Sequence, residues 1–124
     1  AGFVAQASPT DLVGMAATIE EAIRYPGFAF VNVQSPCVTY GEEAQQIKGL
    51  KAISESLAGL GHNPADRLAA MDLAQQYGEK MHLGVFYRNP EPPPTYGDLV
   101  KERQALLSKD ALPKERILDL FIKK

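Results

Sequence analysis

The sequence feature that most constrains the fold is a strand–helix–strand pattern at the start of the chain. Residues 2–7 (GFVAQA) are short and apolar and predict a strand. Residues 9–25 repeat apolar side chains at helical spacing and predict an amphipathic helix, which the following Pro-Gly pair ends. Residues 28–33 (FAFVNV) predict a second strand. Such a short βαβ unit normally has parallel strands and a right-handed crossover.

Helical periodicity dominates the rest of the chain. Ser8 and Asn63 are each followed by a proline, and we expect each to be the N-cap of a helix that begins at that proline. The helix after Asn63 is expected to end near Gly78. Residues 42–60 also predict a helix, with one apolar face formed by Ile47, Leu50, Ile53, Leu57 and Leu60.

Two short segments interrupt the helices in the C-terminal half. Residues 83–88 (LGVFYR) predict a third strand, and residues 89–94 (NPEPPP) predict a stiff extended linker, since consecutive prolines favour polyproline II. Residues 95–98 (TYGD) are typical of a capping box and predict a further helix behind them. A last short helix is expected, with its apolar side at Ile117, Leu120 and Phe121.

These elements predict an α/β fold: a parallel sheet with flanking helices, followed by a helical C-terminal tail. Three parts are expected. Residues 1–40 form the βαβ unit, residues 41–88 add helices and a further strand packed on it, and residues 89–124 form a Pro-rich linker and a helical arm. Because the chain opens at Ala1 directly into a strand-like segment, we expect a start in the middle of a domain, with an unpaired sheet edge.

Composition excludes several classes of protein. The chain has 124 residues, 45% hydrophobic and 23% charged, which fits about one globular domain. A net charge of -2 gives no electrostatic case for binding nucleic acid or an anionic membrane. No apolar run approaches the ~20 residues that span a bilayer. One cysteine excludes an internal disulfide framework and fits a reducing compartment, so we expect a cytoplasmic protein.

Few residues are candidates for chemistry. The chain has no glycine-rich phosphate loop, HExxH, CxxC or GxSxG motif. His62 and His82 are isolated, and we expect each to be solvated or hydrogen-bonded locally. The acidic pairs at 20–21 and 42–43 are expected on exposed helix faces, so no catalytic residue is predicted in this chain.

Cys37 is the exception, and two interpretations of it stay open. A free cysteine is most often a small buried hydrophobic residue. However, Cys37 lies immediately after the strand at 28–33, and ligands of parallel α/β sheets gather outside the carboxyl ends of the strands. An iron–sulfur cluster takes about four protein ligands. A cluster at Cys37 would therefore need its other ligands from outside these residues.

Three stretches of the sequence resemble one known family. They are GFVAQASPTDL (2–12), EAIRYPGFAFVNVQSPCVTY (21–40) and NPADRLAAMDLAQQYGEKMHLGVFYRNPEPPPTYGDL (63–99), and together they cover more than half of the chain. In this order they resemble the C-terminal part of the β subunit of 2-oxoacid:ferredoxin oxidoreductases. The stretch LGVFYRNPEPPPTY (83–96) is more typical of the 2-oxoglutarate-like branch.

The resemblance implies a fold, an activity and cofactors. Residues 1–40 would be the βαβ end of a thiamine-diphosphate-binding domain. The enzymes use thiamine diphosphate, Mg²⁺ and a 4Fe-4S cluster to convert a 2-oxoacid and coenzyme A into an acyl-CoA and CO₂, with electrons passing to ferredoxin; some run in reverse. Cys37 would be the fourth cluster ligand, with backbone N–H groups around Val38 and Thr39 donating to the sulfurs.

The sequence also departs from the family. The Gly-Asp-Gly motif for thiamine diphosphate and Mg²⁺ is absent, as are the other cluster cysteines, so these sites are expected outside this chain. The expected partners are the remainder of the β subunit, the α subunit and ferredoxin, and the chain alone is expected to be inactive. Two alternatives stay open. One is a pyruvate- or branched-chain-specific member of the family, and the other is a non-catalytic interaction domain derived from this fold.

Overall fold

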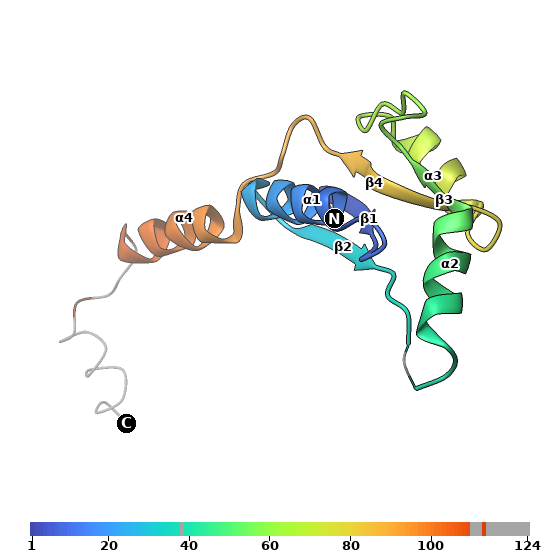
Figure 1. Ribbon diagram of the computed structural model, residues 1–124. Helices are drawn as coiled ribbons and strands as arrows, with labels where there is room; N and C mark the ends of the chain where they lie inside the picture. Colours follow the sequence, from blue (N-terminus) through green and yellow to red (C-terminus); the bar gives the residue numbers. More distant parts are fainter. Residues whose placement is uncertain (38, 110–112, 114–124) are drawn as a thin grey trace. The chain divides into compact units, whose positions relative to one another are not determined.

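The computed structural model describes residues 1–37, 39–109 and 113, in two units that span Ala1–Pro93 and Pro94–Lys124. The second unit contains α4 (Tyr96–Lys109). The first unit contains, in chain order, β1 (Phe3–Ala7), α1 (Leu12–Arg24), β2 (Ala29–Val33), α2 (Glu43–Ile53), β3 (Ser54–Ser56), α3 (Arg67–Gln75) and β4 (Met81–Arg88) (Figure 1).

The predicted strand–helix–strand unit is confirmed. β1 and β2 pair in parallel, in register from Phe3 opposite Ala29 to Ala7 opposite Val33, and α1 connects them. Tyr25, which follows the last residue of α1, is buried, with its ring centroid 5.6 Å from that of Phe3. With Ala5, these two residues form the first hydrophobic cluster of the unit. The residue that follows the C-terminal end of α1 therefore packs against β1.

The α/β class is confirmed, but the sheet is mixed and not wholly parallel. Its strand order is β2-β1-β4-β3, in which β3 and β4 are parallel and β1 and β4 are antiparallel. The sheet of the first unit is thus built from two strand–helix–strand pairs, β1–α1–β2 and β3–α3–β4, joined at β1 and β4, and α2 lies between them in the chain. Each crossover fixes strand direction only within its own pair, so sequence periodicity does not determine how the pairs meet. The first strand, β1, lies inside the sheet and not at its edge.

The helix expected over residues 42–60 ends early. α2 stops at Ile53, and residues 54–56 form β3, paired with Met81 to Leu83 of β4. Leu57 continues this pairing, because its N–H donates to the Leu83 carbonyl at 2.9 Å. Leu57 is 2% exposed and forms the second hydrophobic cluster with Ala70 and Phe86. The apolar residues predicted to form one helix face therefore do not lie on one helix: some belong to α2, and Leu57 packs in the core beneath α3.

Both expected N-caps are wrong by the same three residues. Asp11 and Asp66 cap α1 and α3 with their carboxylates. The side chains of Ser8 and Asn63 instead accept a hydrogen bond from the backbone N–H two residues later. In each case the first polar residue makes a turn around the proline, and the aspartate after it begins the helix.

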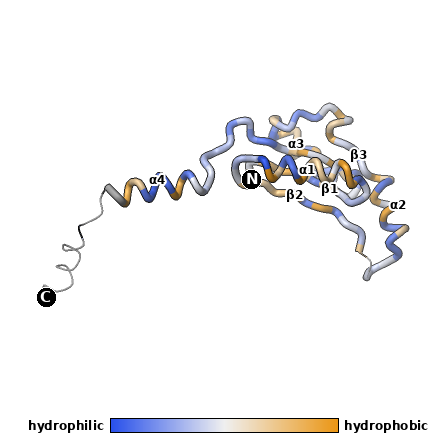
Figure 2. Tube along the Cα trace, turned by 60° about the vertical axis from the view of Figure 1, so that its left-hand side comes forward, coloured by the Kyte–Doolittle hydropathy of each residue, from blue (hydrophilic) through white to orange (hydrophobic). Residues whose placement is uncertain are grey.

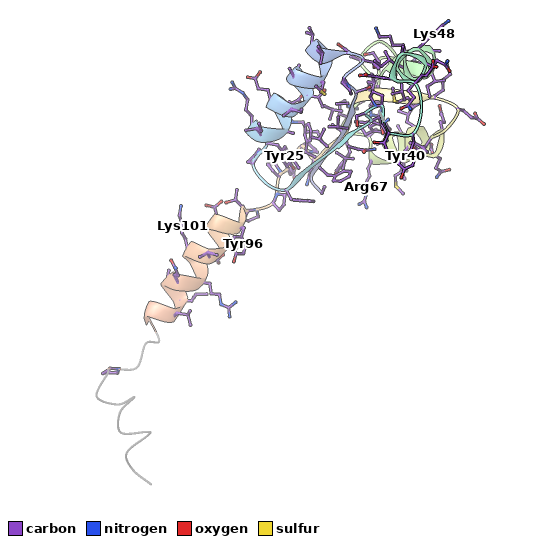
Figure 3. All side chains as sticks on the ribbon, turned by 60° about the horizontal axis from the view of Figure 1, so that its bottom comes forward. Tyr25, Tyr40, Lys48, Arg67, Tyr96 and Lys101 are labelled. Atoms are coloured by element: carbon purple, nitrogen blue, oxygen red, sulfur yellow. The ribbon has the colours of Figure 1, made fainter. Side chains whose placement is uncertain are left out.

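In the second unit, the predicted capping box is confirmed. The Thr95 hydroxyl accepts from the Asp98 N–H at 3.2 Å, and the Asp98 carboxylate accepts from the Thr95 N–H at 3.2 Å. Figure 2 shows hydrophobic and hydrophilic residues alternating along α4, and Tyr96 and Lys101 project from it (Figure 3). The short helix expected around Ile117, Leu120 and Phe121 lies outside the described residues. Within the described residues, no helix has the length and apolar content to cross a bilayer.

Candidate functional site

Cys37 lies in the loop that leads from the end of β2 to the start of α2 (Figure 1). The parallel pairing extends into this loop, since the Gln34 N–H donates to the Ala7 carbonyl at 2.9 Å. The Cys37 thiol is free and exposed, and it belongs to neither hydrophobic cluster of the described residues. In the described structure Cys37 is thus not the small buried residue that composition favours.

The sulfur of Cys37 accepts hydrogen bonds from two residues of its own turn. Hydrogen bonds from the backbone of Thr39 and, second, of Tyr40 lower the pKa of the Cys37 thiol below its ordinary value, because they favour the thiolate. Thr39 is one of the donors expected from the sequence, whereas Tyr40 was missed and Val38 lies outside the described residues. The turn therefore favours the thiolate form of this exposed cysteine more than water does.

A glutamine of α2 holds the same turn from the other side. The Gln46 Oε1 accepts from the Cys37 N–H at 2.6 Å, and the Gln46 Nε2 donates to the Cys37 carbonyl at 2.9 Å. Nε2 also lies 3.4 Å from the Tyr40 carbonyl. The sequence left open whether residues 41–61 lie near Cys37, and this contact brings the first turns of α2 against it.

The other candidate residues have hydrogen-bond or ion-pair partners within the first unit. The His62 Nε2 lies 2.7 Å from the Phe86 carbonyl, and the buried His82 Nε2 lies 3.0 Å from the Gln76 Oε1. The His82 contact is between residues six positions apart, as expected of a local hydrogen bond, whereas His62 contacts a residue of β4 that lies 24 positions away. Of the acidic pair at 20–21, Glu21 forms an ion pair with Arg88 at 2.6 Å. Among the residues that the structure describes, no three His, Cys, Asp or Glu side chains gather as metal ligands.

Sequence reasoning missed a cavity of about 780 Å³ on one face of the sheet. The buried side chain of Gln6 links the strands on either side of β1: its Nε2 donates to the His82 carbonyl of β4 at 3.0 Å, and its Oε1 accepts from the Asn32 Nδ2 of β2 at 3.0 Å. Arg67 and Lys80 also line the cavity. The sequence does contain an indication of this polar pair: Gln6 and Asn32 are the amide residues of two otherwise apolar strands, and the parallel register places them opposite each other.

Comparison with known proteins identifies the family. A family model for the C-terminal part of the pyruvate ferredoxin oxidoreductase beta subunit matches residues 37–104, more than half of the chain, and the match begins at Cys37. The chain belongs to this family. The resemblance found in the sequence, to the C-terminal segment of the β subunit of a 2-oxoacid:ferredoxin oxidoreductase, is therefore confirmed.

A solved structure supports the assignment of this β-subunit segment. It is a 2-oxoglutarate:ferredoxin oxidoreductase from Magnetococcus marinus with 2-oxoglutarate, coenzyme A and succinyl-CoA bound. The two chains are 30% identical with a TM-score of 0.78, over 97% of this chain. The segment covers only 40% of the length of that chain. A search of curated proteins gave no match.

The loop of the β-subunit segment fits one ligand of an iron–sulfur cluster. Such clusters are held by cysteine thiolates, and hydrogen bonds to sulfur adjust their potential. Cys37 offers an exposed thiol whose pKa is lowered by the backbone of Thr39 and Tyr40, in keeping with this donor chemistry.

Proposed function

We propose that this chain is part of a 2-oxoacid:ferredoxin oxidoreductase that acts on 2-oxoglutarate, and that Cys37 is a ligand of its 4Fe-4S cluster. The observation that carries the proposal is the Cys37 turn. It places a free thiol just beyond the carboxyl end of β2, with backbone donors around the sulfur, at the first residue of the family match. The choice of acid follows the 2-oxoglutarate enzyme that the chain resembles over nearly its whole length.

The proposed reaction is oxidative decarboxylation. 2-Oxoglutarate and coenzyme A give succinyl-CoA, CO₂ and one proton from the coenzyme A thiol, and the electron pair released passes singly to two oxidised ferredoxins. Thiamine diphosphate with Mg²⁺ supplies the carbanion chemistry when bound, at a site outside this chain. The same balance read backwards fixes CO₂, and we include that direction in the proposal.

The residues of this chain have three tasks in the proposed enzyme. Cys37 donates its thiolate to one iron. The backbone of Thr39 and Tyr40 donates to that sulfur, which stabilises negative charge on it as electrons arrive. The sheet holds the loop, because the Gln34 N–H fixes the exit of β2 to Ala7.

The remaining requirements lie on partners. A cluster takes about four protein ligands, and this chain has one cysteine. We therefore propose a cytoplasmic heteromer in which the remainder of the β subunit supplies the other ligands, and in which an α subunit and ferredoxin take part. The chain alone is then inactive.

The test is an anaerobic assay of the protein purified with its partner polypeptides. We expect reduction of ferredoxin that requires both coenzyme A and 2-oxoglutarate, and that is lost in a Cys37→Ala variant. Ser35→Ala is the matched control, since Ser35 is an exposed residue of the same loop. If the enzyme prefers pyruvate, the acid in the family description, or a branched-chain 2-oxoacid, the proposed substrate is wrong but the proposed type of reaction stands. No ferredoxin reduction with any 2-oxoacid would overturn the proposal in favour of an interaction domain.

A further inference from the structure

We propose that Gln46 is a positioning residue for the cluster, because its side-chain amide fixes the Cys37 turn in the shape that keeps backbone donors on the sulfur. The inference rests on the proposed function, in which Cys37 is a cluster ligand. It adds a residue of α2 to a site that the sequence places on one cysteine alone.

The amide of Gln46 engages both backbone groups of Cys37. It accepts from the Cys37 N–H at 2.6 Å and donates to the Cys37 carbonyl at 2.9 Å, as a neighbouring strand would. The same Nε2 lies 3.4 Å from the Tyr40 carbonyl, so one side chain spans the turn from residue 37 to residue 40. The backbone that carries the Cys37 thiol is thereby held to a helix and not left to water.

Gln46 is itself held in place. It lies in the first turns of α2, where its N–H donates to the Glu42 carbonyl at 3.1 Å. The other end of α2 is fixed to the sheet, because β3 follows directly and pairs with β4. Gln46 therefore connects the Cys37 turn to the sheet through a helix.

Gly41 lies against the same amide, at the far end of the flexible Gln46 side chain. A Cβ at Gly41 would lie 2.7 Å from the Gln46 Nε2, closer than such contacts occur. Gly41 also has a φ of +145°, a backbone conformation that residues with a side chain rarely adopt. A glycine at this position leaves room for the amide.

The chemical consequence concerns the electrons on the cluster. Hydrogen bonds to cluster sulfur stabilise the reduced, more negative state. If the turn loosens, Thr39 and Tyr40 no longer keep their backbone donors on the sulfur. We expect the cluster then to have a more negative reduction potential and to lose iron more easily. Partners that orient a metal ligand are typically worth about 10–100-fold in metal affinity.

The test uses the purified oxidoreductase with its partners, and the variant Gln46→Met, which keeps side-chain length but makes no amide hydrogen bonds. Gln45→Met is the matched control, because the neighbouring Gln45 amide contacts Glu42 and not the Cys37 turn. Electron paramagnetic resonance during a redox titration gives the potential, and a chelator gives the rate of iron loss. We expect a more negative potential and roughly tenfold faster iron loss in Gln46→Met, with Gln45→Met unchanged.

A second variant and a reference keep the result interpretable. Gly41→Ala, which displaces the amide from the other side, is expected to shift the potential in the same direction even if Gln46→Met assembles poorly. Wild-type potential and iron loss in both Gln46→Met and Gly41→Ala would overturn the inference. Cys37→Ala defines which resonance belongs to this cluster. If Cys37→Ala leaves every resonance in place, the proposed function fails, and the role of Gln46 fails with it.

Discussion

Leu57→Ala is a substitution for which the structure predicts a large loss of stability. Leu57 is 2% exposed and packs with Ala70 and Phe86 beneath α3. Truncation removes three carbons from this cluster, which at ~0.8 kcal/mol each gives about 2.4 kcal/mol of lost transfer free energy. The cavity left behind adds to this, within the range of roughly 2–5 kcal/mol for buried Leu→Ala changes. We expect the free energy of unfolding to fall by about 3 kcal/mol.

The assay is urea or thermal unfolding of the chain, followed by circular dichroism. For a unit the size of Ala1–Pro93, each kcal/mol lowers Tm by roughly 4–8 °C, so the expected loss is about 12–24 °C. Leu68→Ala is the matched control: it is the same chemical change on α3, at a side chain that is 74% exposed. It should change the free energy by no more than about 0.5 kcal/mol. Equal losses in the two variants would refute the placement of Leu57 in the core after β3.

Four other predictions follow from individual hydrogen-bonded groups. The rate of alkylation of Cys37 by iodoacetamide in the metal-free chain should rise with pH to a midpoint that is lower than the midpoint for the same chain unfolded in urea. The reason is that Thr39 and Tyr40 lower the thiol pKa in the folded state. Equal midpoints for the folded and unfolded chain would contradict this. Because the thiol pKa is lower in the folded state than in the unfolded state, ionised Cys37 stabilises the fold at pH values above the unfolded-state pKa. This stabilisation is lost as the pH falls through the folded-state pKa. Cys37→Ser should remove this pH dependence of stability. Gln6→Leu should cost about 1–3 kcal/mol in urea unfolding, because it leaves a buried carbonyl of β4 without its donor; no loss would show that this carbonyl finds another partner. Asp66→Ala should cost about 1 kcal/mol by removing the N-cap of α3, whereas Asn63→Ala should cost less; the reverse order would restore the cap expected from the sequence.

Much of the fold was predictable where periodicity and turn chemistry act locally. The β1–α1–β2 unit followed from one apolar run, one amphipathic run and a second apolar run. The capping box at 95–98 followed from residue types at fixed spacing. These elements depend on residues close together in the chain, so the sequence contains the information directly.

The failures depend mostly on residues far apart in the chain. β3 is only three residues long and exists through its pairing with β4, which overrides the helical spacing that continues to Leu57. The antiparallel meeting of β1 and β4 depends on how two strand–helix–strand pairs pack. The two wrong N-caps are different, because the correct aspartates were visible in the sequence. The error there was to give priority to the residue before each proline.

The candidate site divides in the same way. The place of Cys37 beyond β2 and the contact of His82 with Gln76 were predictable, since each depends on residues nearby in the chain. The contact of His62 with the Phe86 carbonyl was not, because 24 residues separate the two. Gln46 was not, because nothing in its sequence context distinguishes it from Gln45. The folded turn brings the amide of Gln46, and not that of Gln45, onto the Cys37 backbone.

The measurement that tests the central claim most directly is the iron content and electron paramagnetic resonance spectrum of the purified oxidoreductase with Cys37→Ala, beside Ser35→Ala. The account predicts that Cys37→Ala loses or converts one 4Fe-4S cluster per copy of this chain, with a reduced-state resonance missing, while Ser35→Ala keeps the wild-type spectrum. Full iron content and an unchanged spectrum in Cys37→Ala would contradict it, and would show that Cys37 does not hold a cluster.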